Sequence, residues 1–330
     1  MKALVYTQPN QVAYRDEPEP VMADGEVIVA IDAAGICGSD MHAFHGHDPR
    51  RNPPLILGHE LCGRIVAGPG SGKRVTVNPL ITCGICEYCV TGRDNLCANR
   101  TMIGMTRPGG FADRMSIPAS SLIDIPQDMS PRQAALTEPA ATALHAINLA
   151  MRALPRPVPE SNALVIGGGA VGLLVALLLK AYGCRDIRIA ETNPLRRKSA
   201  EQASGCSAYD PAAEKGPGAI SVALVVDAVG GNATRTAAFA AVKPGGVVLH
   251  IGLMDWATAI DMRKLTLAEI TLIGSYTYTT ADLRATVQAL SAGTFGDLAW
   301  VEERKLADGA KAFSDLSQGR SAAAKIVLRP

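Results

Sequence analysis

The sequence predicts an α/β protein in which a β-rich first part is followed by a doubly wound parallel sheet. The first 140 residues hold short alternating strands such as EVIVAIDAAG, GRIVAG and KRVTV, broken by Gly and Pro. From residue 162 to about 276, apolar strands alternate with helical segments, as in a parallel sheet covered on both faces. With 330 residues, 48% of them hydrophobic, the chain can bury the cores of two domains.

Composition and turn residues divide the chain into three segments, residues 1–140, residues 141–276 and residues 277–330. We expect the last segment to fold back onto the first. A helix over residues 142–152 leaves the first segment, and the Pro-rich LPRPVPESN follows it. The strands ALVIG, IRIAE, LVVDAVGG, GGVVLHIGL and TLIGSY then build the parallel sheet, and the tail holds the helical DLRATVQALSAG and a final strand KIVLRP. Because such sheets bind ligands at the carboxyl ends of their strands, we expect the site in a cleft between the domains.

Four of the eight cysteines, in CGICEYCVTGRDNLC, have the spacing of a closed metal site. Four thiolates from one compact loop satisfy a zinc ion tetrahedrally and leave no position for substrate. Free thiols or two disulfides are the alternatives, but disulfides fit poorly with a chain of this length that begins MKALVYTQP without an apolar signal run. We therefore predict a structural zinc site. Its ligands are Cys83, Cys86, Cys89 and Cys97.

A second set of possible ligands precedes the first by about twenty residues. Cys37 stands in GICGSDMH, and His59 and Glu60 stand in ILGHELCG. A thiolate, an imidazole and a carboxylate suit zinc, and three protein ligands leave one position for water or substrate. Taken singly, each residue could instead be structural. Glu138, in ALTEPAATALHA, is a further candidate, or simply an acidic residue favoured near a helix start.

The segment SNALVIGGGAVGLLVALLLKAYG has the pattern of a dinucleotide-binding turn. Residues 163–166 predict a buried strand and residues 173–181 the helix that follows it. Between them, Gly167, Gly169 and Gly172 have the G-x-G-x-x-G spacing. The first glycine makes the tight turn, the second lets backbone approach the pyrophosphate, and the third permits close strand–helix packing. A glycine-rich loop in an unrelated α/β unit is the alternative.

The choice of nicotinamide cofactor depends on a carboxylate nineteen residues after the last of these glycines. Glu191 ends the strand IRIAE, where it can accept hydrogen bonds from ribose hydroxyls and repel a 2′-phosphate. Arg196 and Arg197 act in the opposite direction, since an arginine cluster could hold that phosphate. The sequence favours NAD.

With these features in this order, the chain resembles the zinc-dependent medium-chain alcohol and polyol dehydrogenases. The resemblance runs from MKALVYTQP to AAAKIVLRP and includes GHELCGRIVAGPGSGKRV and GGFADRMSIPASSLIDIPQDMS. The sorbitol and threonine dehydrogenase branch is most similar, because His-Glu is followed by a later Glu-Pro where ethanol-type members carry a cysteine ligand. The resemblance implies a chaperonin-10-like twisted β-barrel catalytic domain over residues 1–140, with both zinc sites, and a Rossmann cofactor domain over residues 141–276.

The resemblance also implies the reaction, in which a hydride moves between an alcohol, such as a secondary alcohol of a polyol or sugar alcohol, and NAD. Two zinc ions per chain are expected, one catalytic and one structural. The catalytic ion would be held by Cys37, His59, Glu60 and Glu138, with either glutamate binding directly or through a water molecule.

Further residues take roles by the same resemblance. Ser39 would accept the substrate proton, and the cofactor ribose would pass it to His42, although His45 and His47 close by would also fit a polar loop. Asp40 would orient the zinc-bound imidazole through its second ring nitrogen. Cofactor contacts are expected at Gly167, Gly169, Ala170, Val171, Gly172, Glu191, Arg196, Val229, Ile251, Leu253 and Ser275.

Charge and hydropathy limit the partners. A net charge of +1 without a basic run offers no surface for nucleic acid or an anionic membrane, and the longest apolar stretch, residues 173–179, is too short to span a bilayer. Cysteine use fits a reducing cytosol, with Cys62, Cys184 and Cys206 as structural thiols. We expect a cytoplasmic enzyme with a small-molecule alcohol as substrate, and the family implies a homodimer or homotetramer.

Two alternatives remain at this stage. An NADP-dependent alcohol or ketone reductase of the same superfamily is the first, although reductases without catalytic zinc lack the pattern of Cys37 and His59-Glu60. The second is a non-catalytic zinc and nucleotide-binding protein, in which Cys83 to Cys97 would form a ribbon that binds nucleic acid. The neutral charge and the dinucleotide pattern oppose binding to nucleic acid. The identity of the alcohol does not follow from the sequence.

Overall fold

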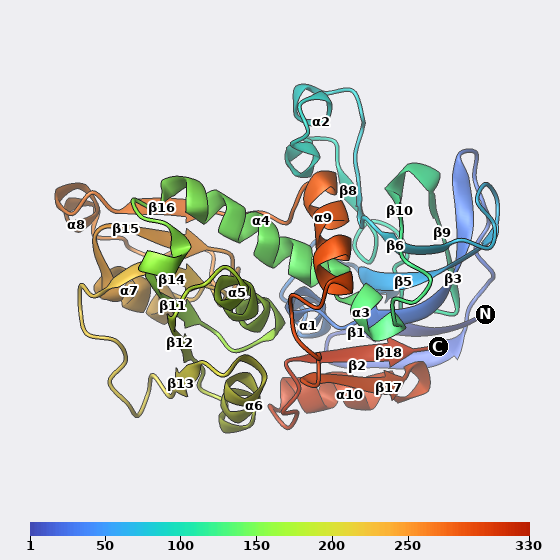
Figure 1. Cartoon of the computed structure of the whole chain (residues 1–330). Helices are drawn as coiled ribbons and strands as arrows, with labels where there is room; N and C mark the ends of the chain where they lie inside the picture. Colours follow the sequence, from blue (N-terminus) through green and yellow to red (C-terminus); the bar gives the residue numbers. More distant parts are fainter.

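The computed structural model describes residues 1–330 and shows two parts joined side by side (Figure 1). The parallel sheet with its helices forms one part, on the left of Figure 1, and the β-rich part lies on the right with both termini. The last two strands of the chain lie among the first ones, because β18 (Lys325–Arg329) pairs antiparallel with β3 (Glu26–Gly35). The tail of the chain therefore lies against the first part.

The β-rich part has a seven-stranded sheet, in the order β10-β6-β5-β3-β18-β17 with β9 on β3, and a three-stranded sheet, β2-β1-β4. Along β3 the side chains alternate between core and surface, so Val27, Val29 and Ile31 are buried on one face, as its period-two pattern requires. The other strands are β1 (Lys2–Gln8), β2 (Gln11–Asp16), β4 (Leu55–Ile56), β5 (Glu60–Ala67), β6 (Arg74–Val77), β7 (Leu80–Ile81), β8 (Thr101–Met102), β9 (Arg114–Pro118), β10 (Leu122–Asp124) and β17 (Val301–Lys305).

The second part is a six-stranded sheet in the order β13-β12-β11-β14-β15-β16, in which every pair is parallel. The strand order reverses between β11 and β14, so the carboxyl ends of these two strands border the ligand crevice expected of this topology. The strands are β11 (Asn162–Ile166), β12 (Asp186–Ala190), β13 (Ser207–Tyr209), β14 (Val222–Asp227), β15 (Val242–His250) and β16 (Thr271–Gly274).

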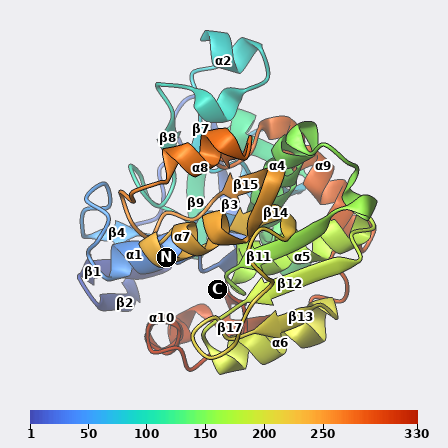
Figure 2. The ribbon, with the colours of Figure 1, turned by 90° about the vertical axis from the view of Figure 1, so that its left-hand side faces the viewer.

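Helices cover both faces of the parallel sheet, as Figure 2 shows with α7 on one side and α4 and α5 on the other. Alternate strand residues pack on each side: Val165 and Val226 lie in the core with α4 and α5, and Leu164 and Val225 lie in the core with α7. The helices are α1 (Gly38–Phe44), α2 (Glu87–Val90), α3 (Pro131–Ala135), α4 (Thr137–Ala153), α5 (Ala170–Ala181), α6 (Pro194–Ser204), α7 (Asn232–Ala241), α8 (Met262–Leu267), α9 (Thr280–Ser291) and α10 (Gly309–Ser317), with short 3-10 turns at Asp94–Leu96, Ala119–Ser121, Val158–Glu160 and Leu306–Asp308.

The helix between the two parts begins earlier than the helix predicted over residues 142–152. α4 starts at Thr137, five residues before the predicted start at residue 142, so Glu138 lies inside its first turn and the expected boundary near residue 140 falls within the helix. Pro139 is tolerated there because the first turn of a helix needs no backbone donor. The core around α4 also holds Ala33 and Cys62 of the first part, so this helix joins the two cores. None of the helices is long and apolar enough to cross a membrane.

Candidate metal and cofactor site

Three of the four expected catalytic ligands meet in the first part of the molecule. Ligand atoms of Cys37, His59 and Glu60 all lie within 4.8 Å of one another. Cys37 is the residue that caps α1, and His59 directly precedes Glu60, the first residue of β5. Gly35 on β3 pairs with Glu60, and a Cβ atom at Gly35 would collide with the Glu60 carboxylate. The glycine therefore provides the space that this ligand group occupies.

Asp40 lies against the imidazole of His59, as the resemblance implies. The Asp40 Oδ2 atom accepts a hydrogen bond of 3.0 Å from the Cys37 backbone N–H, and Oδ1 lies 3.5 Å from Nδ1 of His59. Burial disfavours a charged His59, but the Asp40 carboxylate and the Cys37 thiol outweigh it and raise the pKa of His59 well above its usual value. A buried site that favours positive charge beside a thiol, an imidazole and a carboxylate has the donor set and charge that suit a zinc ion.

A buried lysine from the far end of the chain binds the third ligand group. Lys325 Nζ lies 2.6 Å from each oxygen of the Glu60 carboxylate and donates a further hydrogen bond of 2.8 Å to the carbonyl oxygen of Ile36. Both Lys325 and Glu60 are buried, so the two charges compensate one another away from water. The carboxylate that would bind a metal is thus already held by a cation.

The structure does not bring Glu138 into this ligand cluster. Its Oε1 atom accepts a hydrogen bond of 2.7 Å from the hydroxyl group of Tyr278, and both side chains are buried. Burial, reinforced by the nearby Glu60 carboxylate, raises the pKa of Glu138 to about 7. Three of the four ligands expected from the sequence therefore lie together. The fourth, Glu138, is held against Tyr278 by the first turn of α4 and is not within reach of all three others.

The two residues expected to move protons both lie on α1. Ser39 is the second residue of the helix, and its Oγ atom accepts a hydrogen bond of 3.2 Å from Arg51. His42, one turn later, lines the cleft that also contains Cys37 and Glu60. Burial lowers the pKa of His42, and His47 lowers it further, so the imidazole is neutral and able to accept a proton near neutral pH.

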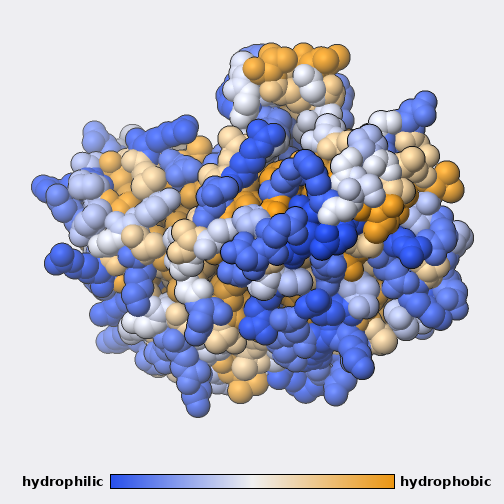
Figure 3. Space-filling view, turned by 45° about the vertical axis from the view of Figure 1, so that its right-hand side comes forward, coloured by the Kyte–Doolittle hydropathy of each residue, from blue (hydrophilic) through white to orange (hydrophobic).

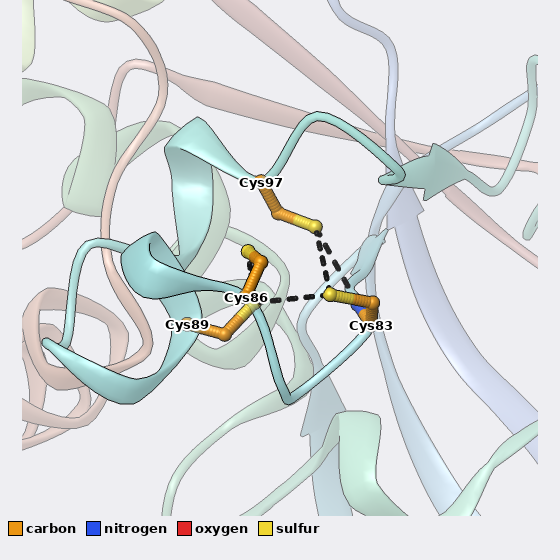
Figure 4. A group of neighbouring side chains, drawn as sticks. All are labelled: Cys83, Cys86, Cys89 and Cys97. Carbon is orange, nitrogen blue, oxygen red and sulfur yellow. Dashed lines mark hydrogen bonds between the residues drawn. The ribbon is translucent and has the colours of Figure 1, made fainter.

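The four remaining predicted metal ligands gather on a loop that projects from the first part (Figures 1 and 4). Sulfur–sulfur distances are 3.6 Å between Cys83 and Cys97, 3.5 Å between Cys86 and Cys89, and 3.9 Å between Cys83 and Cys89. Four thiolates placed tetrahedrally at about 2.3 Å from a zinc ion would lie about 3.8 Å apart, so the cluster fits that ion. All eight cysteines are free thiols, which excludes a disulfide pairing here.

The glycine-rich turn has the geometry that its spacing predicts. Gly167 follows β11 with φ +103°, in the left-handed region that favours glycine, and a Cβ atom at Gly172 would collide with the carbonyl oxygen of Gly167. A Cβ atom at Gly169 would meet nothing within 4 Å, so the second glycine faces open space. Gly169 caps the N-terminus of α5, where free backbone N–H groups favour a phosphate.

Glu191 is buried behind this turn and is held by three donors. Its Oε2 atom accepts a hydrogen bond of 2.9 Å from the Gly168 N–H, and Oε1 accepts bonds from the Asn193 N–H at 2.7 Å and Arg196 at 3.2 Å. Four lone-pair positions on a carboxylate leave one free for a ribose hydroxyl. Arg197 donates to the carbonyl oxygen of Glu191. Both arginines are therefore engaged by their own chain.

One cleft contains the metal ligands and the glycine-rich turn together. It is lined by Cys37, His42 and Glu60 of the first part and by residues of the parallel-sheet part. The expected cofactor residues in its lining are Gly167, Gly169, Ala170, Val171, Gly172, Glu191, Arg196 and Val229. Ile251, Leu253 and Ser275 are not among the lining residues but follow β15 and β16 at the same carboxyl edge of the sheet.

Sequence reasoning missed several residues that complete the site. Arg51 and Tyr278 carry no local signal, because nothing in RRNPP or SYTYT distinguishes them from surface residues. Lys325 carries a weak signal, since it interrupts an otherwise apolar run in AAAKIVL. A charged residue at the start of a buried strand requires a partner of opposite charge, and here that partner is Glu60.

Two parts of the chain match known protein families. Residues 23–127 match the family described as alcohol dehydrogenase GroES-like domain, and residues 170–292 match the family described as zinc-binding dehydrogenase. L-galactonate-5-dehydrogenase of Escherichia coli (strain K12) is 31% identical over 307 residues, covering 89% of this chain and 88% of that protein.

Two solved structures have the same fold over almost their full length. A zinc-binding dehydrogenase from Sinorhizobium meliloti 1021, bound to NADP, superposes with a TM-score of 0.89 at 27% identity and covers 100% of this chain and 99% of its own. An alcohol dehydrogenase from Escherichia coli CFT073, complexed with NADH, superposes with a TM-score of 0.88 at 26% identity and the same coverage.

Proposed function

The chain belongs to the zinc-dependent medium-chain alcohol and polyol dehydrogenases, and we propose that it oxidises a secondary alcohol of a sugar-derived polyol with NAD. The observation that carries this proposal is the shared cleft, in which the ligand cluster of the first part meets the glycine-rich turn of the second. The similarity to an enzyme named for a sugar acid favours a substrate with several hydroxyl groups.

The chemistry divides between bound groups and the chain. A zinc ion held by Cys37, His59 and Glu60 would supply a Lewis acid that makes an alkoxide accessible near neutral pH, and the nicotinamide would accept the hydride. In the overall reaction the alcohol loses a hydride from carbon and a proton from oxygen, so a ketone, NADH and one free proton are formed.

The chain must carry that proton to solvent. We propose that Ser39 accepts it from the substrate hydroxyl while its own proton leaves towards His42, whose lowered pKa keeps it neutral and ready to accept. Asp40 keeps the imidazole of His59 in one orientation, and Lys325 holds the carboxylate of Glu60. The four cysteines of the projecting loop would hold a second zinc ion, whose role is structural.

NAD is the proposed cofactor because of Glu191. The related structures hold NADP in one case and NADH in the other, so the choice depends on this chain's own pocket. A 2′-phosphate beside the buried Glu191 carboxylate would be a like-charge contact costing several kcal/mol. Arg196 is paired with that carboxylate, which leaves it less able to attract the phosphate.

The test of the function is NADH formation by the zinc-loaded enzyme over a panel of polyols, sugar alcohols and sugar acids. We expect turnover with at least one of them and higher kcat/KM with NAD than with NADP. For Glu191→Ser the preference for NAD should fall by at least about tenfold, while Glu201→Ser, an exposed carboxylate on α6, leaves it unchanged. No turnover on any alcohol would overturn the function, and a wild type that favours NADP would overturn the role of Glu191.

We also propose that the enzyme is a homo-oligomer assembled through the edge of its parallel sheet. β16 pairs only with β15, so its outer edge has free backbone groups. Apolar side chains near this edge are exposed, including Leu267 at 72% and Trp256 at 94%. Light scattering should show a dimer or tetramer, and Leu272→Asp on β16 should shift it to a monomer; a monomeric wild type would contradict this proposal.

A further inference from the structure

A buried arginine contacts the serine that we place in the proton path. The side chain of Arg51 has 0% exposure and donates hydrogen bonds to three separate segments. Its Nη2 atom lies 3.2 Å from Ser39 Oγ, and Nη1 lies 2.9 Å from both the Ser39 carbonyl oxygen and Oδ2 of Asp48. Its Nε atom donates to the carbonyl oxygen of Gly104 at 2.9 Å. Two of the four bonds therefore end on Ser39.

The preceding residue provides a natural comparison. Arg50 binds the same carboxylate of Asp48, at 2.8 Å and 3.0 Å, but its side chain is 62% exposed. It makes no hydrogen bond to Ser39. The exposed Arg50 already pairs with Asp48, so pairing with Asp48 does not explain why a second guanidinium is buried. Burying a guanidinium costs free energy unless all its donors are used.

We propose that Arg51 is a positioning residue of the proton path, one that holds the Ser39 hydroxyl so that it accepts the substrate proton and donates its own towards His42. This inference rests on the proposed function, since it concerns the same reaction.

The numbers of donors and acceptors on Ser39 and Arg51 determine the direction in which the proton moves. A serine hydroxyl has one O–H donor and two acceptor lone pairs, and a guanidinium can only donate. With Arg51 on one lone pair of Ser39, one lone pair remains for the substrate O–H, and the Ser39 proton must point to another acceptor. In the transfer the substrate O–H bond breaks, a new Oγ–H bond forms, and the original Ser39 proton leaves towards His42. One proton enters Ser39 and one leaves, while the hydride goes to NAD.

The charge of Arg51 acts on the same path. The groups whose charges act on His42 are His47, Asp48, His45 and Arg51, in that order of influence after burial. Asp48 raises the pKa of His42 and the other three lower it. Removing Arg51 should therefore raise the pKa of His42, so that this base is protonated at higher pH and oxidation is lost earlier as the pH falls.

The experiment compares Arg51→Met, Arg51→Lys and the matched control Arg50→Met in the zinc-loaded enzyme. Arg51→Met should lower kcat by about 10- to 100-fold, as expected for a lost charged hydrogen bond, with the KM for NAD unchanged. Its rate profile should shift to higher pH. Arg51→Lys should keep the pKa of His42 because it keeps the charge, yet lower kcat because it loses the fork that reaches Ser39. Arg50→Met should match the wild type in kcat and in the pH dependence of its rate.

A double-mutant cycle with Ser39→Ala separates positioning from general stabilisation. If Arg51 acts through the serine, Arg51→Met should add no further loss of kcat in the Ser39→Ala enzyme. Additive losses, or losses that follow the fall in melting temperature, would overturn the proposal. If Arg51→Met does not fold, the cycle is performed with Arg51→Lys.

A readout without turnover keeps this test apart from that of the function itself. The chain has only six histidines, so the His42 imidazole can be titrated by NMR. A raised His42 pKa in Arg51→Met, with no change in Arg50→Met, supports the inference. An unchanged His42 pKa overturns it, even if the wild type is found to oxidise no alcohol and the proposed function fails.

Discussion

The two cysteine-containing clusters of this chain use similar donors for opposite purposes. The closed cluster, Cys83 to Cys97, comes from one short loop that projects into solvent, and its sulfur atoms contact mainly one another. The open cluster of Cys37, His59 and Glu60 is assembled from α1 and β5 in the interior, where His59 lies beside Asp40 and Glu60 is bound by Lys325.

From this difference we expect the closed cluster to stabilise the fold and the open cluster to take part in the chemistry. The projecting loop of 15 residues is visible in Figure 3 as a knob with a hydrophobic tip. Ile85 and Val90 in this loop are exposed, so the loop has little core of its own and we expect a metal to hold its shape. In the interior cluster His59 and Glu60 are buried beside the cleft, so we expect the fold around it to form without a metal. Its buried charges instead prepare one position for a cation and a substrate.

The largest expected effect is at the open cluster. Cys37→Ser should lower turnover by several orders of magnitude, because a catalytic ligand is lost, while the melting temperature and NADH affinity stay close to those of the wild type. Steady-state kinetics, thermal unfolding and an NADH titration measure the three quantities, with Cys206→Ser as the control. Full activity in Cys37→Ser after the loss of one zinc ion would show that the two roles have been assigned to the wrong clusters.

The support of the open cluster should be visible in the metal-free protein. Lys325→Met leaves the Glu60 carboxylate buried without its cation, which should cost about 3–5 kcal/mol of unfolding free energy. Zinc should restore much of this loss by supplying positive charge, so zinc binding should stabilise the variant more than the wild type. Denaturant unfolding with and without zinc measures this, and Lys73→Met, which breaks an exposed ion pair with Asp124, should change little. If zinc stabilised the variant and the wild type equally, Lys325 would not be the cation that compensates the Glu60 carboxylate.

The proton path should show a smaller and pH-dependent effect. His42→Gln should slow alcohol oxidation by about 10²-fold, the usual range for loss of a general base. Because burial and the neighbouring cations lower the His42 pKa, the wild type keeps a neutral base below the usual histidine range. The loss should therefore be greatest from that lowered pKa up to neutral pH and shrink in alkali, where hydroxide can replace the base. His145→Gln is the control, because His145 neither acts on the pKa of His42 nor lines the cleft. An unchanged pH–rate profile for His42→Gln would remove this residue from the path.

The smallest effect on turnover is expected at the closed cluster. Cys89→Ser should lose one zinc ion and lower the melting temperature, because a structural zinc site contributes folding free energy directly. The kcat of the enzyme that remains folded should stay within about twofold of the wild type, since no residue of this loop lines the metal and cofactor cleft. Kinetics below the melting temperature, with zinc analysis, decide this. A Cys89→Ser variant that keeps its stability but loses its turnover would contradict the structural role of the closed cluster.

The closed cluster and the glycine-rich turn could be predicted because their geometry is encoded within a few residues. Spacing alone brings four thiols together, and the strand, glycines and helix of the turn are adjacent in the chain. The parallel sheet followed for the same reason, since its strands alternate with helices. α4 begins before the pattern from residue 142 indicates, because Glu138 and Pro139 in its first turn do not extend that apolar pattern.

The surroundings of the open cluster could not be predicted, because they depend on contacts between distant segments. Lys325 reaches Glu60 across 265 residues, and Tyr278 reaches Glu138 across 140. Only the packed fold shows that a cation already holds one expected ligand and a hydroxyl holds another. Arg51 illustrates the same limit, since its proposed role follows from burial against Ser39 and not from its place in the sequence.

Stepwise removal of metal from the wild-type enzyme tests the division between the clusters most directly. Zinc content, turnover and melting temperature are measured on the same samples as a chelator is added. We predict two zinc ions per chain, with loss of the first abolishing turnover at a nearly unchanged melting temperature, and loss of the second lowering that temperature. A chain that holds a single zinc ion, or one whose turnover survives until its fold is lost, would contradict the account.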